Sequence, residues 1–195
     1  MADTPAPTIP RGLLPFCGVL AAAAAAGVAV TGNLEFVFYL AVLVVLAGLI
    51  YWAHRHVGFS AAVLWLLAAW AAMHMAGGLV GVPASWPTEG EGRVLYSWRL
   101  IPGLLKYDNV VHAFGFGVST LACFEGLWST VGPAAASMRR SLILFAALSA
   151  LGLGAMNEVV EFAATLLVPE TNVGGYVNTG WDLVSNLVGV GAASA

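Results

Sequence analysis

Long apolar stretches separated by short polar segments dominate the chain. Most are close to the length at which a helix crosses the hydrocarbon core of a bilayer, about 20 residues, although the last is shorter. They cover residues 13–32, 36–52, 59–82, 108–127, 141–168 and 182–195. A chain inside a bilayer must satisfy its backbone hydrogen bonds internally, and helices do so. The pattern therefore predicts an all-α integral membrane protein, a bundle of about six transmembrane helices without a sheet.

Two polar segments stand outside this pattern. Residues 1–12 contain prolines and charges of both signs, which predicts a disordered N-terminal cap before a single transmembrane domain at 13–195. Residues 83–107 are one long loop with further prolines and charged side chains. Loops of this length in compact proteins are often lids or binding loops, so this loop is expected to cover a site.

The composition agrees with a membrane protein. Hydrophobic residues make up 60% of the 195 residues, charged residues only 9%, and the mean hydropathy is +0.88. So little charge cannot cover a globular surface in water. The net charge of −3 is spread thinly and gives no basic stripe, which argues against nucleic acid as a partner. Cys17 and Cys123 lie in separate apolar stretches and predict neither a disulfide nor a thiol-metal site.

Ionisable residues inside these stretches are the candidate chemistry. A charged side chain in the middle of a membrane helix costs about 2.5 to 3.5 kcal/mol, so such residues usually face the bundle interior and mark a site. Glu158 and Glu161 are three residues apart and share one helix face, and so do Asp108 and His112, four apart. If the helices alternate in direction, these residues, His74 and Asp182 all lie near one end of the bundle.

The distribution of basic residues predicts the orientation. Positive residues concentrate in cytoplasmic loops. An N-terminus inside puts four basic residues in the cytoplasm and three outside: Arg11, Arg55, Arg139 and Arg140 against Arg93, Arg99 and Lys106. We therefore expect a multi-pass protein of the cell (inner) membrane with both termini in the cytoplasm and the site facing the outer leaflet.

The three outer cations run against this bias. Arg93, Arg99 and Lys106 are therefore expected to contact an anionic group such as the phosphate of a membrane lipid. Local pairing with Glu89 and Glu91 is the alternative interpretation, because exposed ion pairs of this kind are common and contribute little.

Four short motifs carry a resemblance to a known family. They are Met-His-Met-Ala-Gly-Gly at 73–78, Tyr-Asp-Asn-Val-Val-His-Ala-Phe at 107–114, Asn-Glu-Val-Val-Glu at 157–161 and Trp-Asp-Leu-Val-Ser-Asn at 181–186. In this order they resemble the YjdF-like inner-membrane proteins and, more distantly, the VanZ-like family. The resemblance covers about residues 73–191 and implies a membrane helical bundle. It also implies signature roles for Asp108, His112, Glu158, Glu161 and Asp182, but no reaction.

Three hypotheses compete for these residues. In the first, one or two divalent metals, zinc, manganese or iron, serve an enzyme that acts on a lipid-linked phosphate or headgroup. The predicted ligands are His74, His112, Glu158, Glu161, Asp108 and Asp182, and the four carboxylates among them are the predicted catalytic groups. In the second, the same side chains form an interhelical hydrogen-bond network in a structural or accessory protein, which acts with other membrane subunits or as a homo-oligomer. In the third, they relay protons or ions.

Overall fold

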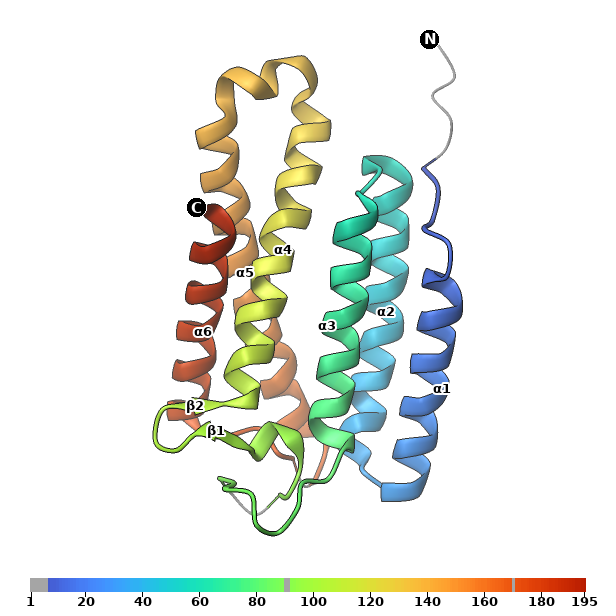
Figure 1. Cartoon of the computed structure of the whole chain (residues 1–195), viewed down its shortest axis with the longest axis vertical. Coiled ribbons are helices and arrows are strands. Elements are labelled where there is room, and N and C mark those ends of the chain that lie inside the picture. The colour runs from blue at the N-terminus through green and yellow to red at the C-terminus, as the bar shows by residue number, and fades with distance from the viewer. Residues whose placement is uncertain (1–6, 90–91, 170) are drawn as a thin grey trace.

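The computed structural model describes residues 7–89, 92–169 and 171–195, and it is predominantly helical (Figure 1). The predicted cap at 1–12 therefore lies partly outside the described residues. The elements in chain order are α1 (Leu13–Thr31), α2 (Leu34–Val57), α3 (Ala61–Leu79), η1 (Leu95–Ser97), β1 (Arg99–Ile101), β2 (Leu105–Lys106), α4 (Tyr107–Val131), η2 (Gly132–Met138), α5 (Arg139–Leu167) and α6 (Tyr176–Ser194). In Figure 1 the helices α1 to α3 stand beside α4 to α6, with their axes roughly parallel.

The number of membrane spans differs from the prediction. Four helical segments are long and apolar enough to cross a membrane: Leu13–Thr31, Leu34–Val57, Ala61–Leu79 and the 61-residue run Tyr107–Leu167. This last run joins α4, η2 and α5, because the expected turn near Pro133 is itself helical. The helix α6 is not among the candidates, since polar residues interrupt its apolar sequence. The described chain thus has five long helical runs and four candidate spans, and the prediction of six is wrong.

A small sheet also departs from the prediction of helices alone. The strands β1 and β2 pair antiparallel, with Arg99 opposite Lys106. Gly103 makes the turn between them at φ 74°, a left-handed conformation that glycine adopts without a steric penalty. The backbone N–H of Leu104 donates to the Ile101 carbonyl at 3.0 Å and closes the turn. Sequence patterns for strands need longer alternation than these few residues offer.

The described part of the predicted 83–107 loop covers one end of the bundle. Backbone hydrogen bonds join its two arms, since the N–H of Val82 donates to the Arg93 carbonyl at 2.9 Å. Others fasten it to the helices on either side: Leu95 N–H donates to Val80 at 3.0 Å, and Tyr107 N–H to Trp98 at 2.9 Å. The loop lies at the lower end of Figure 1, where α3 ends and α4 begins.

Small residues let α4 and α6 approach closely. A Cβ atom at Gly189 would lie 1.8 Å from the backbone oxygen of Ala113, and a Cβ at Gly117 would lie 3.1 Å from that of Gly189. Glycine notches of this kind allow helix backbones to pack closely within membranes. Gly191, two residues further along α6, has open space at its Cβ position. The crossing of α4 and α6 is thus fixed by specific glycines, and it holds the first turns of the two helices together.

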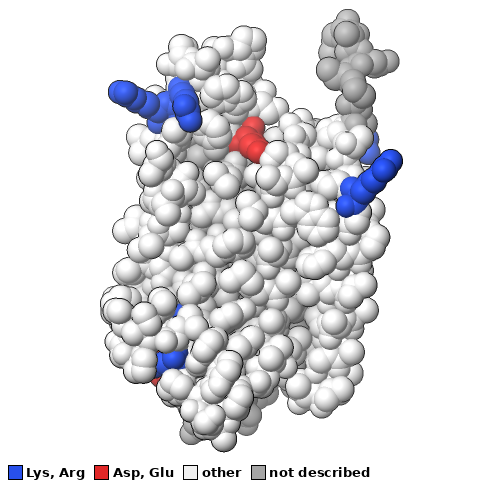
Figure 2. Space-filling model, in the orientation of Figure 1, with Lys and Arg blue, Asp and Glu red and all other residues white. Residues whose placement is uncertain are grey.

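The surface has the distribution of charge expected of a membrane protein. In Figure 2 the lysine, arginine, aspartate and glutamate side chains gather towards the two ends of the molecule. Many large apolar side chains on α2, α5 and α6 are exposed, for example Val44, Leu148, Phe162 and Leu187. Such a surface is compatible with lipid and not with water.

Candidate metal and headgroup site

His112 lies at the centre of the ionisable cluster, one turn and a half into α4. Its Nε2 atom is 3.6 Å from Asp108 Oδ1 on the same helix and 3.7 Å from Glu161 Oε1 on α5. Its Nδ1 atom is 3.8 Å from Glu158 Oε1, also on α5. Three carboxylates from two helices therefore surround one imidazole ring, at the loop-covered end of the bundle.

Asn186 on α6 contacts one of the two nitrogens of the His112 ring. Its Oδ1 atom lies 3.1 Å from His112 Nδ1, and with the ring protonated at Nδ1 this contact is a hydrogen bond from the imidazole to the amide oxygen. The lone pair of the neutral ring is then on Nε2, the nitrogen between Asp108 and Glu161. A Cβ atom at Gly154 would lie 2.8 Å from Asn186 Nδ2, so the glycine of α5 leaves room for this amide.

The carboxylate oxygens of Glu158 are buried and have no hydrogen bond to a described residue. The whole side chain is only 10% exposed. Glu161, one turn further along α5, accepts a hydrogen bond from Asn157 Nδ2 at 2.8 Å. A buried carboxylate without hydrogen bonds is unfavourable unless a positive charge lies beside it. The cluster is therefore suited to a cation.

Asp182 joins the cluster from the first turns of α6. It is 1% exposed, and its two oxygens accept hydrogen bonds from Asn109 Nδ2 at 3.4 Å and Asn178 Nδ2 at 2.6 Å. Lys106 Nζ lies 3.6 Å from Asp108 Oδ2 and also donates to Asn178 Oδ1. These contacts connect the end of the loop, the start of α4 and the start of α6.

Two sets of three side chains have the spacing of metal ligands. In each set, one potential ligand atom from every residue lies within 4.8 Å of the others. The sets are Asp108, His112 and Asp182, and His112, Glu158 and Glu161. The five predicted site residues on α4, α5 and α6 are thus brought together, with His112 common to both sets.

His74 is not part of either set among the described residues. Its Nδ1 atom lies 2.5 Å from the hydroxyl of Tyr96 in the loop, and its ring packs edge-on against Tyr39, with ring centroids 5.3 Å apart. Burial and the nearby Asp108 carboxylate raise the pKa of Tyr96 well above its usual range, so the phenol keeps its proton and donates a hydrogen bond to His74 Nδ1. The Nδ1 atom of His74 is thus bonded to the loop, and its role as a ligand stays a prediction.

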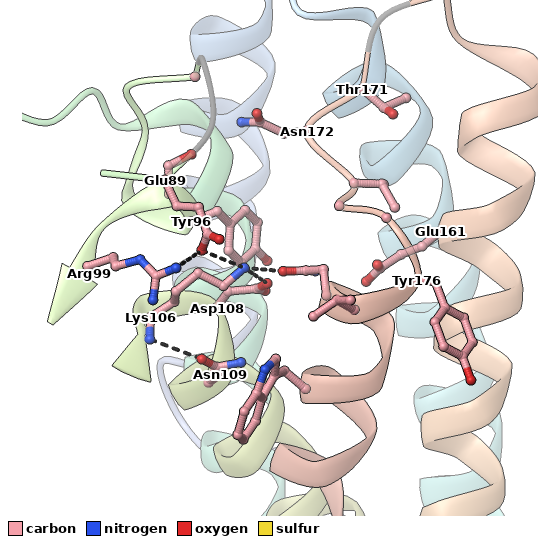
Figure 3. A pocket seen from close by; sticks show the side chains of 18 of the residues that line it. Glu89, Tyr96, Arg99, Lys106, Asp108, Asn109, Glu161, Thr171, Asn172 and Tyr176 are labelled. Carbon is pink, nitrogen blue, oxygen red and sulfur yellow. Dashed lines mark hydrogen bonds and ion pairs between the residues drawn. The ribbon is translucent and has the colours of Figure 1, made fainter. Parts of the chain in front are cut away.

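A cavity of about 740 Å³ opens beside the cluster, and Figure 3 shows part of its wall. Asp108 and Glu161 reach it from the cluster, while Arg99 and Lys106 line it from the loop and Asn172 from the segment before α6. The covering loop and this segment leave a polar chamber large enough for a phospholipid headgroup. The cluster can therefore meet a polar molecule.

The three loop cations have different positions. Arg99 Nη2 forms an ion pair with Glu89 Oε2 at 2.6 Å, and Lys106 Nζ lies 4.0 Å from the same oxygen. Arg93 is not among the cavity-lining residues; its guanidinium donates to the carbonyls of Pro83 and Trp86 and holds the loop together. The alternative of local pairing thus accounts for the contacts of Arg99 and Lys106 with Glu89. Glu91 lies outside the described residues.

Sequence reasoning missed several residues of the chamber. Glu35 was not among the predicted site residues; it is the second residue of α2 and is buried in the chamber wall. Asn178 was not among them either, and it lies one turn before Asp182 on α6. The spacing of Asn178, Asp182 and Asn186, four residues each, would have indicated one polar helix face.

The fold and the cluster together define a class: a multi-pass membrane protein with buried histidine, aspartate and glutamate groups at one end of its helical bundle. The particular family follows from comparison with known proteins. The chain belongs to the family described as predicted membrane protein (DUF2238), whose model matches residues 13–195. No curated protein and no solved structure matches the chain. The family match by itself shows no link to the YjdF-like or VanZ-like proteins, so that resemblance stays a prediction from the four motifs.

Proposed function

We propose that this protein is a metal-dependent membrane enzyme that acts on a lipid-linked phosphate. The observation that carries the proposal is the arrangement of Glu158, Glu161 and His112, in which a buried carboxylate without hydrogen bonds belongs to a set of ligand spacing. The cluster holds four carboxylates, on Asp108, Asp182, Glu158 and Glu161, beside the single cation Lys106. A metal-binding His112 is neutral, so the ionised carboxylates leave an excess of negative charge that a divalent cation would offset.

The donor set fits particular metals. One imidazole nitrogen together with carboxylate oxygens suits zinc, manganese or iron better than calcium or magnesium, which prefer oxygen alone. The hydrogen bond from His112 Nδ1 to Asn186 is the kind of outer contact that orients a metal-binding histidine. His112, Glu158 and Glu161 would hold the ion, with Asp108 and Asp182 as the alternative carboxylates.

The distances favour this proposal over a hydrogen-bond network. A network of carboxylates and imidazole is held by contacts of about 2.7 to 2.9 Å. The three contacts of His112 with carboxylates are longer, between 3.6 and 3.8 Å. A proton relay is less well supported, because both ligand sets of the described residues share His112 and so lie at one end of the bundle.

The chamber supports a phosphate substrate. Lys106 and Arg99 line it on the loop side, and both offer hydrogen bonds to phosphate oxygens. A bound divalent ion would neutralise a phosphoryl oxygen and lower the pKa of a water molecule. In this proposal Asp108, which lines the chamber, receives the proton of the attacking water, and Lys106 orients the phosphate. The chamber opens to the outer leaflet of the inner membrane.

Element analysis of the detergent-purified protein tests the metal site. We expect zinc, manganese or iron to remain after dialysis in the wild type and to be lost in Glu158→Gln. The matched control is Glu125→Gln, because Glu125 accepts a hydrogen bond from the Ser60 backbone N–H and belongs to neither ligand set. Equal metal content in wild type and Glu158→Gln would overturn the proposed site.

Headgroup release tests the enzymatic part. The metal-loaded protein is incubated with vesicles of phospholipid, and released phosphate or phosphorylated headgroup is measured. We expect release by the wild type and by Glu125→Gln, and loss of at least two orders of magnitude in Asp108→Asn, the size of effect typical of a lost general base. A metal-loaded wild type without activity on any vesicle would favour the structural alternative.

A further inference from the structure

Glu35 is a buried carboxylate that the proposed chemistry does not use. It is 4% exposed, lines the chamber from the first turn of α2, and accepts a hydrogen bond from the Asn172 backbone N–H at 2.9 Å. Within the described residues, no cationic side chain lies at ion-pair distance from it. It belongs to neither ligand set, so the ion proposed above does not compensate its charge.

Aromatic side chains surround this acidic wall. Tyr39 follows Glu35 by one helical turn on the same face, and Tyr96 comes from the covering loop; both line the chamber. Phe36 packs edge-on against Tyr39, with ring centroids 5.4 Å apart, and lies 6.4 Å from Tyr96, so the rings support one another. A carboxylate beside tyrosine rings is the composition of sites that bind ammonium groups, through charge and through cation–π attraction.

The hairpin supplies cationic side chains to the same chamber. Arg99 and Lys106 line it there, and Figure 3 shows them beside Glu89 and Asp108. The chamber thus offers cations next to the metal-ligand cluster, and Glu35 with its tyrosines from α2 and the covering loop. Its volume of about 740 Å³ accommodates a headgroup that reaches both groups of side chains.

We infer that the substrate headgroup is zwitterionic: an ammonium group lies against Glu35, Tyr39 and Tyr96, and a phosphate lies on the side of Lys106. The inference rests on the proposed function, since it names the substrate class of the same chamber. The shared chemistry is that of phosphoethanolamine, either as a lipid headgroup or as a free molecule. An anionic headgroup such as phosphoglycerol lacks the positive group that Glu35 would pair with.

Lipid binding to the purified full chain tests the inference. Native mass spectrometry compares phosphatidylethanolamine, phosphatidylglycerol and N-acetylated phosphatidylethanolamine with identical acyl chains. We expect the wild type to bind phosphatidylethanolamine about tenfold more tightly than either of the others, as one retained charged contact would give. Equal or tighter binding of phosphatidylglycerol would overturn the inference. The N-acetylated lipid changes only the ligand, so its result does not depend on the folding of a variant.

The variant Glu35→Gln tests the residue. Its amide oxygen still accepts from the Asn172 backbone, so the anchoring of that segment is preserved while the charge is removed. We expect the tenfold preference to fall to about equal binding in this variant and to persist in Glu125→Gln. A preference that survives Glu35→Gln, in a variant that elutes as the wild type does, would also overturn the inference.

Two further measurements separate the outcomes. Metal content is expected to be unchanged in Glu35→Gln and lost in Glu158→Gln, so a preference without any metal would sink the proposed function alone. Metal without a preference would sink this inference alone. Water-soluble phosphoethanolamine as a competitor identifies the source of the ligand: full displacement at equal concentration indicates a free molecule, and weak displacement indicates the lipid.

Discussion

Asn186 Oδ1 lies 3.1 Å from His112 Nδ1, so an amide on α6 fixes the ring on α4 around which the carboxylates gather. Neither residue is near the other in sequence. The contact exists because Gly189 lets α6 approach α4 and Gly154 leaves room for the amide. The packing of α4, α5 and α6 therefore determines the orientation of the His112 ring.

Removal of the Asn186 amide should weaken metal binding. We expect Asn186→Ala to lower the affinity for zinc or manganese by about 10- to 100-fold, the range typical of lost outer-shell contacts, because the His112 ring can then rotate. Titration of the detergent-purified protein with a competing chelator measures the affinity. The control is Ser194→Ala, on the same helix, where the hydroxyl donates only to the Val190 carbonyl. Unchanged affinity in Asn186→Ala would contradict the assigned orientation.

Metal should stabilise the folded protein through His112. A ligand at 100 times its dissociation constant adds about 2.7 kcal/mol to the free energy of unfolding. We therefore expect the wild-type melting temperature to rise on addition of zinc or manganese and to fall back with chelator. His112→Gln should show no rise, because both ligand sets lose their shared member. An equal rise in His112→Gln would mean that the ion binds elsewhere.

The crossing of α4 and α6 should tolerate a methyl group at one glycine and not at its neighbour. Gly189→Ala would put a Cβ atom 1.8 Å from the Ala113 oxygen, so the helices must separate, and we expect destabilisation of about 1 to 3 kcal/mol. Gly191→Ala meets open space and should be neutral or slightly stabilising, since alanine favours helix. Unfolding in mixed micelles compares the two. Similar stabilities would show that the helices do not cross at Gly189.

The loop cations should affect binding of anionic lipid in a salt-dependent manner. Arg99→Gln removes a positive charge from the chamber wall, and we expect weaker binding of phosphatidic acid vesicles at low ionic strength and little difference above about 0.5 M salt. Folding should be unaffected, because the pair of Arg99 with Glu89 is partly exposed and contributes at most about 1 kcal/mol. The control is Arg55→Gln, in the last turn of α2. Equal loss of lipid binding in Arg99→Gln and Arg55→Gln would mean that the net charge of the protein, and not the position of Arg99, determines binding.

Orientation in the membrane is open to a direct labelling test. In a background in which Cys17 and Cys123 are replaced by serine, single cysteines at Ser85 and Ser137 are exposed to an impermeant maleimide in intact cells. We expect labelling at position 85, in the covering loop, and none at 137, in η2. The reverse pattern would place the chamber towards the cytoplasm.

Helix-forming stretches and short polar spacings were predictable because they depend on residues close in sequence. The pairing of Asp108 with His112 needs only a separation of four residues on one helix. The position of Glu35 in the chamber wall was not predictable, because it depends on how α2 and the Asn172 segment meet, 137 residues apart in the chain. The hairpin at Gly103 is similarly too short for a strand pattern, and Pro133 lies in the first turn of the short helix η2, a position that proline favours.

His112 belongs to both candidate ligand sets, and its second nitrogen is bonded to Asn186. Two ions therefore compete for one lone pair, and titration should saturate at a single equivalent per chain. The five residues then offer two alternative positions for one ion, and an ion bound near Glu158 excludes one near Asp182. Movement between the two positions would carry the ion from α5 to α6 while the histidine stays in place.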